Sequence, residues 1–306
     1  RDQWNLLALA GWRLDDVITK NQVLRLMSHQ KELNFVPGDE FSYCNTGYTL
    51  MGEIVSRVSG KSFSEWCSEN MFKPLAMNNT LFYDDHERIV KNRAYSYYDS
   101  DDGLKKSVLS YANAGATSLF TTAEDLTRWA NNFYTMKVGN ANVMKQMEER
   151  GRLNKGDTLN YAFGQDISKY RGIKAISHSG GDAGYRSFLL RFPDQKIAIA
   201  VLSNLGSFNP GGLAYKIADI YLKQYFKEEP KKEEIKSTEK NVKVSDKLLK
   251  MYEGQYLLTK EMLVTCKLDN NKFTVQATGQ PAAELKAMSE TEFIIDGTDI
   301  RIVFDT

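Results

Sequence analysis

Residues 176–203 read ISHSGGDAGYRSFLLRFPDQKIAIAVLS, and this stretch indicates the fold more clearly than any other. Residues 185–192 and 196–202 have the composition and periodicity of strands, and Pro193-Asp194-Gln195 is the turn that joins them. The segment before them, which ends in His178-Ser179-Gly180-Gly181, predicts a further strand. A hairpin of adjacent strands favours an antiparallel sheet.

Helical patterns lie on both sides of this hairpin. The first begins with Asn45 or Thr46 as its cap and ends at Gly60, the usual C′ position. Capping boxes predict the start of two more helices, at Ser62-x-x-Glu65 and at Thr121-x-x-Glu124. A last amphipathic helix is predicted over residues 213–226, with Ile217, Ile220, Tyr221 and Tyr225 on its apolar side. Together these elements predict an α+β fold, an antiparallel sheet flanked by helices.

A run of Lys and Glu over residues 228–247 divides the sequence. Such a segment buries too little apolar surface to fold alone, so it is predicted to be a solvated linker. It separates a larger domain, residues 1–227, from a smaller one, residues 248–306. The smaller part contains only short strand patterns, at residues 254–258, 263–268, 272–276, 284–287, 292–295 and 299–304. Regularly spaced short strands predict a small all-β barrel or sandwich.

Charge and composition exclude several classes of protein. The 40 Lys and Arg against 39 Asp and Glu give a net charge of +1, which offers no electrostatic footprint for nucleic acid. No apolar run approaches the ~20 residues of a membrane-spanning helix. The three cysteines and three histidines lack the spacing of a metal site, and no metal or other cofactor is expected. The chain opens at Arg1 without an initiator Met, and we interpret it as a piece of a longer protein.

Two segments carry side chains suited to chemistry. The first, residues 37–45, reads PGDEFSYCN and leads into the first predicted helix. Tyr43 and Asn45 lie two residues apart at this junction, where both can project into one cleft. The alternative is a packed aromatic at Tyr43 and a simple helix cap at Asn45.

The second segment is His178-Ser179-Gly180-Gly181 at the end of a predicted strand. Its glycines leave backbone N–H groups uncovered, so a substrate carbonyl could approach closely. The alternative is a β-bulge with a histidine that is simply hydrogen-bonded.

Taken together, Tyr43-x-Asn45 and His178-Ser179-Gly180-Gly181 resemble the second and third motifs of the serine β-lactamase-like superfamily. That superfamily includes class C β-lactamases, penicillin-binding DD-peptidases, esterases and D-aminopeptidases, and its third motif is often Lys-Thr-Gly. The resemblance covers about residues 1–226, and further matching segments are residues 37–52, 72–80, 121–126, 184–194 and 202–204. It implies the β-lactamase/transpeptidase-like fold. The strand-rich end resembles the small lipocalin-like domain of some members.

The family's first motif, a nucleophilic Ser-x-x-Lys, has no convincing counterpart here. Ser28–Lys31 lies too close to Tyr43 in a polar run, and Ser237–Lys240 lies in the predicted linker. We therefore expect the nucleophile upstream of Arg1.

The resemblance implies a role for each matched residue. The upstream serine would attack a carbonyl, and Tyr43 would take its proton, directly or through the motif lysine. Asn45 would bind the amide side chain of the substrate. His178 and Ser179 would orient Tyr43 and a substrate carboxylate.

The two glycines complete the expected site. The N–H of Gly181 would be one oxyanion donor, and Gly180 would border the substrate together with Ser179. The resemblance implies a serine hydrolase that cleaves a small or peptide-like amide, lactam or ester, with export to the periplasm or cell envelope. A histidine in the third motif favours a peptidase or esterase over a dedicated β-lactamase. The alternative is a penicillin- or peptide-binding or sensor module that has lost its nucleophile.

Overall fold

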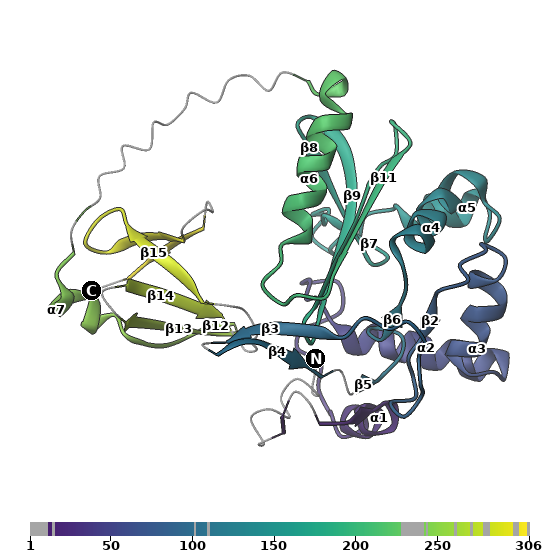
Figure 1. Ribbon diagram of the computed structural model, residues 1–306, viewed down its shortest axis with the longest axis horizontal. Coiled ribbons are helices and arrows are strands. Elements are labelled where there is room, and N and C mark those ends of the chain that lie inside the picture. The colour runs from purple at the N-terminus through teal and green to yellow at the C-terminus, as the bar shows by residue number, and fades with distance from the viewer. Residues whose placement is uncertain are drawn as a thin grey trace. The chain divides into compact units, whose positions relative to one another are not determined.

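The chain forms two compact units in a computed structural model, Arg1–Glu228 and Glu229–Thr306 (Figure 1). The structure describes residues 12–13, 16–100, 102–108, 111–227, 242, 244–259, 262–269, 272–277, 282–295 and 300–304. Most of the predicted linker lies outside these residues. Within them, none of the helices has the length and apolar character needed to cross a membrane.

A five-stranded antiparallel sheet is the centre of the first unit, in the order β11-β10-β9-β8-β7. Its strands are β7 (Tyr161–Ala162), β8 (Gln165–Tyr170), β9 (Ile173–Asp182), β10 (Tyr185–Phe192) and β11 (Ile197–Ser203). The β10–β11 pairing runs from Phe192↔Ile197 to Arg186↔Ser203, so the predicted hairpin and the antiparallel sheet are confirmed.

Strand β9 pairs with its two neighbouring strands over different lengths. Its pairing with β8 ends at Asp166↔Ser177, whereas its pairing with β10 continues to Asp182. In this register, residues 178–182 have a strand partner on the β10 side only. The segment His178-Ser179-Gly180-Gly181 therefore occupies an unpaired stretch of strand edge.

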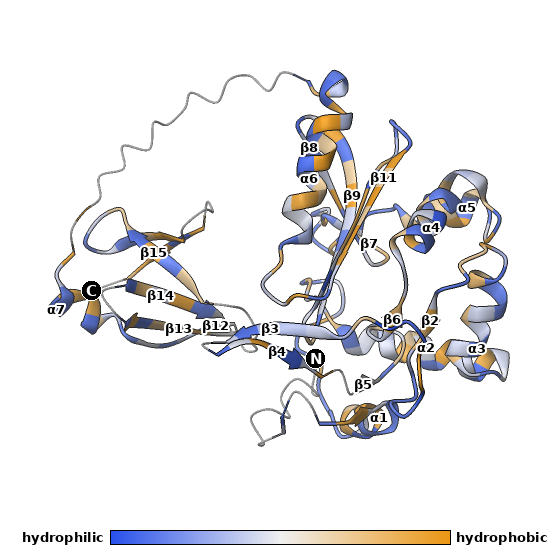
Figure 2. Ribbon diagram, in the orientation of Figure 1, coloured by the Kyte–Doolittle hydropathy of each residue, from blue (hydrophilic) through white to orange (hydrophobic). Residues whose placement is uncertain are grey.

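The helix α6 (Pro210–Tyr221) packs on β10 and β11, and Figure 2 shows hydrophobic residues along α6 and β11. Its buried side chains are small: Ala214 and Ala218 are fully buried, whereas Ile220 and Tyr221 are 75% and 67% exposed. The predicted apolar side was therefore wrong for Ile220, Tyr221 and Tyr225, whereas Ile217 packs against the core as expected. The alanines let the helix backbone approach the sheet closely.

The first unit contains several further helices. They are α1 (Lys20–Ser28), α2 (Asn45–Ser59), α3 (Phe63–Cys67), η2 (Ser68–Phe72), α4 (Ala123–Thr135), α5 (Ala141–Met147) and η3 (Lys223–Tyr225). The predicted end of α2 is confirmed at Gly60, which has φ +69°. The predicted start of α3 at the Ser62 capping box is confirmed as well. Helix α4 is capped by Thr122 and not by Thr121. The hydroxyl of Thr121 is instead bonded to that of Thr80, at 2.8 Å.

Short strand pairs complete the first unit. They are β1 (Ile18–Thr19) with β5 (Tyr111–Ala112), β2 (Leu81–Phe82) with β6 (Leu119–Phe120), and β3 (Ser96–Ser100) with β4 (Gly103–Ser107).

The second unit is a six-stranded antiparallel sheet preceded by helix α7 (Asp246–Met251). Its strands, in sheet order, are β12 (Gly254–Thr259), β13 (Met262–Asp269), β14 (Lys272–Ala277), β15 (Ala283–Ala287), β16 (Glu292–Ile295) and β17 (Arg301–Val303). The rings of Tyr252 and Phe304 stack at 4.2 Å in its core, beside Phe273 and Phe293. The all-β prediction for this part of the chain is confirmed.

Candidate active site

The structure brings Tyr43 and His178 together. The centroids of their rings are 6.0 Å apart, and each ring also lies near Tyr161, at 6.3 Å from Tyr43 and 6.0 Å from His178. Tyr43 is 49% exposed. Residues from the segment before α2, from β9 and from β7 thus form one solvent-accessible cluster.

The segment that carries Tyr43 is tied to a distant loop. The backbone N–H of Asn154 donates to the carbonyl of Gly38 at 2.8 Å, and its side-chain amide donates to Pro37 O at 3.1 Å and to Asp39 Oδ1 at 2.9 Å. Gly38 has φ +91°, and a Cβ there would lie 2.4 Å from Asn154 Oδ1. A glycine is needed at this position for both reasons.

Helix α2 begins at Asn45, and Cys44 is its N-cap, without a capping side-chain hydrogen bond. The prediction that Asn45 or Thr46 caps this helix was wrong by one or two residues. Residues three apart lie on the same helix face, so Asn45 shares a face with Tyr48. The phenols of Tyr48 and Tyr161 interact electrostatically, which places this face of α2 toward β7.

His178 is held through both ring nitrogens. Nδ1 lies 2.6 Å from the carbonyl oxygen of Ser179, and Nε2 lies 3.1 Å from the hydroxyl of Tyr161. The alternative of a hydrogen-bonded histidine therefore describes the ring correctly. The accompanying β-bulge is absent, because the β9–β10 register runs without a shift from Ile176 to Asp182.

The glycines after His178 alternate between the two faces of the sheet. A Cβ on Gly180 would lie 2.3 Å from Ser187 Oγ, and one on Gly181 would lie 3.5 Å from Arg186 Nη1. Because side chains alternate along a strand, His178 and Gly180 belong to one face and Ser179 and Gly181 to the other.

The main chain of this segment is accessible. Ser179, Gly180 and Gly181 are all exposed, and they lie on the edge of β9 that β8 leaves unpaired. Their backbone groups can therefore meet a ligand directly.

Sequence reasoning missed Tyr161 and Tyr48. Burial raises the pKa of both phenols above the ordinary value, so both stay protonated at neutral pH. The sequence signal that could have pointed to them was Gly164, three residues after Tyr161. In the structure Gly164 has φ +79°, and a Cβ added to it would lie 3.3 Å from the Tyr48 hydroxyl. A tight turn directly before a sheet strand is too common a pattern to have singled out these tyrosines.

Asp182 at the end of β9 was missed as well. Its Oδ2 is buried without a hydrogen-bond partner. Burial raises the pKa of this carboxyl to about 7, and a backbone hydrogen bond from Ala183 and the charge of Arg186 offset part of that rise.

The structure describes one of the two rejected Ser-x-x-Lys candidates. Ser28 ends α1, and its hydroxyl donates to the Arg25 carbonyl at 2.8 Å, whereas Ser237–Lys240 lies outside the described residues. In the described part of the chain, no three His, Cys, Asp or Glu side chains gather as metal ligands would.

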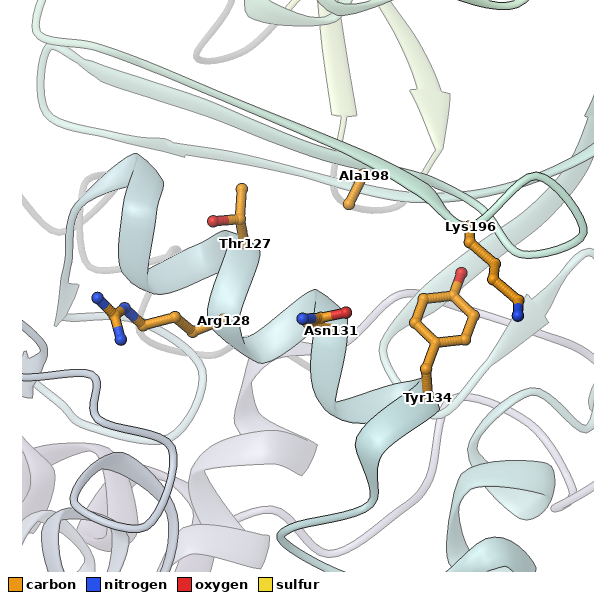
Figure 3. Close-up of a pocket in the computed structure, with 6 residues that line it drawn as sticks. All are labelled: Thr127, Arg128, Asn131, Tyr134, Lys196 and Ala198. Carbon is orange, nitrogen blue, oxygen red and sulfur yellow. The ribbon is translucent and has the colours of Figure 1, made fainter.

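A separate shallow pocket of about 270 Å³ lies between α4 and the β10–β11 hairpin (Figure 3). It is lined by Thr127, Arg128, Asn131, Tyr134, Lys196 and Ala198. None of the site residues expected from the sequence belongs to this lining.

Comparisons with known proteins identify several relatives of this chain. Penicillin-binding protein 4* of Bacillus subtilis (strain 168) is 25% identical, over 96% of this chain and 68% of that protein. A D-aminopeptidase of Gluconobacter oxydans (strain 621H) is 22% identical over 67% of this chain, which spans only 39% of that enzyme. The octameric penicillin-binding protein homologue from Pyrococcus abyssi superposes with a TM-score of 0.64 at 23% identity, over 96% of this chain and 68% of that one.

The structural likeness to the Pyrococcus abyssi protein shows the fold, an antiparallel sheet flanked by helices. The family model described as Beta-lactamase matches residues 7–221, which contain Tyr43, His178 and the whole central sheet. On the strength of that match, this chain belongs to the Beta-lactamase family.

Proposed function

We propose that the chain carries the Tyr-x-Asn and His-x-Gly parts of a serine hydrolase that cleaves an amide, lactam or ester through an acyl-enzyme. The observation that carries this proposal is the 6.0 Å approach of Tyr43 and His178 beside the unpaired edge of β9. The family match and the D-aminopeptidase relative support it. The nucleophile is the serine of the family's Ser-x-x-Lys motif, which we expect upstream of Arg1.

Tyr43 is the proposed proton acceptor. As the serine oxygen bonds to the carbonyl carbon, its proton passes to Tyr43 and then to the leaving amine or alcohol. A phenol with an ordinary pKa of about 10 is a weak base at neutral pH, so nearby positive charge is required. The motif lysine supplies that charge.

Strand β9 is the proposed platform for the substrate. An extended, peptide-like molecule can add to an unpaired strand edge through main-chain hydrogen bonds. The exposed Gly180 and Gly181 allow close approach, and the N–H of Gly181 is the proposed oxyanion donor. Asn45 and Ser179 are proposed to bind the polar groups of the substrate. This mode of binding favours peptide-like amides over a dedicated β-lactam substrate.

A second candidate is a penicillin- or peptide-binding module without turnover. It is favoured by one observation, namely that Ser28, the serine of the Ser-x-x-Lys string that the structure describes, lies at the end of α1 with its hydroxyl bonded to the Arg25 carbonyl. For either function we propose a periplasmic or envelope location and no nucleic-acid partner, on the basis of the family and the balanced charge.

The test uses the full-length protein with a fluorescent penicillin and a p-nitrophenyl ester, and mass spectrometry detects the covalent adduct. We expect an acyl adduct and a loss of orders of magnitude in acylation rate for Tyr43→Phe. Tyr134→Phe, in the pocket of Figure 3, is the matched control and should react like the wild type. Absence of any adduct would favour the binding module, and a Tyr43→Phe variant with an unchanged rate would refute the proposed mechanism.

A further inference from the structure

We propose that Tyr161 is a positioning residue that fixes the orientation and tautomer of His178. Its hydroxyl donates a hydrogen bond to Nε2 and thereby holds the neutral ring as the Nδ1–H tautomer. The assignment of the tautomer stands on the geometry alone. Only its consequence for catalysis rests on the proposed function.

The first step concerns Nδ1 of His178. Its neighbour at 2.6 Å is the carbonyl oxygen of Ser179, which can only accept a hydrogen bond. Nδ1 must therefore carry the hydrogen. In a neutral imidazole the other nitrogen, Nε2, is then an acceptor.

The second step concerns the donor to Nε2. The Tyr161 hydroxyl lies 3.1 Å from Nε2, so its O–H must point to the ring. A chain of donors thus runs from Tyr161 through His178 to the carbonyl of Ser179.

The third step concerns the rigidity of Tyr161. It pairs with Asp166 of β8 in the same sheet as His178, and its carbonyl accepts from the N–H of Gly151 at 2.9 Å. Its ring lies 5.3 Å from that of Phe41 and meets Tyr43 edge-on. The side chain of Tyr161 therefore contacts both the segment before α2 and His178 of β9. Its backbone is held in place by the sheet.

This arrangement assigns His178 a limited role. With its Nε2 lone pair engaged by Tyr161, the neutral ring cannot take a proton from Tyr43 or from the nucleophile unless that bond breaks. His178 instead orients its neighbours. Loss of the Tyr161 hydroxyl frees Nε2 and lets the ring change tautomer.

The test is NMR of the chain labelled with ¹⁵N-histidine. Only His29, His86 and His178 contribute signals, and a His178→Gln variant assigns the third. We expect the ¹⁵N shifts and proton couplings of His178 to show Nδ1–H in the wild type. Tyr161→Phe removes one of the two hydrogen bonds that set the tautomer, so it should weaken this preference, and Tyr134→Phe should keep it.

The signals of the other two histidines serve as the control for folding. Unchanged signals of His29 and His86 would show that the variant is folded.

Two results would overturn the proposal. One is a wild-type His178 in the Nε2–H tautomer, which can be read even if Tyr161→Phe does not fold. The other is a folded Tyr161→Phe variant with an unchanged tautomer preference at His178. Neither depends on hydrolysis, so this proposal and the proposed function fail separately. If both hold, the full-length Tyr161→Phe variant loses acylation rate.

Discussion

Asn154 holds Gly38 by a backbone hydrogen bond of 2.8 Å, and its side chain occupies the space where a Cβ on residue 38 would lie. The segment leading to Tyr43 is thereby fixed against a loop more than a hundred residues further along the chain. The geometry at Tyr43 depends on this contact as well as on α2.

We expect Gly38→Ala to be destabilising and to slow acylation in the full-length protein. Two effects combine, because φ is +91° and the new Cβ would lie 2.4 Å from Asn154 Oδ1. Gly103→Ala is the matched control, since φ is +100° there but no atom lies within 4 Å of the added Cβ. Thermal unfolding should show a larger loss for Gly38→Ala. Equal losses would mean that the Asn154 contact contributes nothing.

Asp182 should make stability depend on pH. Because burial raises the pKa of this carboxyl to about 7 in the folded protein, the folded state binds a proton more tightly than the unfolded chain does. The free energy of unfolding therefore falls as pH rises from about 4 to about 7, and the full penalty persists above pH 7.

Asp182→Asn keeps the shape of the side chain and cannot ionise, so we expect a higher Tm than that of the wild type at pH 8 and a much smaller difference at pH 4. Each kcal/mol should appear as about 2–4 °C. The exposed Asp99→Asn is the control. A Tm difference that is the same at both pH values would contradict the explanation.

Glu148, just after α5, accepts from Lys174 Nζ at 2.8 Å and from Arg191 Nη2 at 3.1 Å. Arg191 is almost fully buried, its guanidinium lies 3.6 Å over the ring of Phe133, and burial lowers its pKa. Glu148→Ala leaves this cation without its counterion, which should cost about 3–5 kcal/mol in denaturant unfolding.

Glu149→Ala is the control for that change, because Glu149 is adjacent in sequence and exposed. It should alter the free energy of unfolding by about 0.5 kcal/mol or less. A Glu148→Ala variant as stable as Glu149→Ala would show that the ion pair is dispensable.

Because Ala214 and Ala218 of α6 are fully buried, we expect larger side chains at these positions to destabilise the protein. Ala218→Leu forces extra atoms between the helix and the sheet and should cost about 1–3 kcal/mol. Ile220→Ala, on the exposed side of the same helix, should be nearly neutral. Chemical denaturation measures both, and a stable Ala218→Leu variant would show that the packing of α6 is looser than in the structure.

Elements defined by local signals could be predicted from the sequence. The alternation in residues 185–202, the Ser62 capping box and Gly60 each act within a few residues, so hairpin, helix start and helix end were found. The cap of α4 was misplaced because Thr121 is engaged by Thr80, forty-one residues away. The apolar side of α6 was misread in part because its fully buried residues, Ala214 and Ala218, are small, whereas the prediction rested on larger apolar side chains.

By itself, the sequence determined the strand and helix pattern and the Tyr43-x-Asn45 and His178-x-Gly180 motifs, because these depend on neighbours along the chain. Only the tertiary structure decided that Tyr161 holds His178, that Asn154 fixes the Gly38 segment and that Asp182 is buried. These contacts join residues that are far apart in the chain, and their energies come from burial and hydrogen bonding in the folded molecule. No local pattern encodes them.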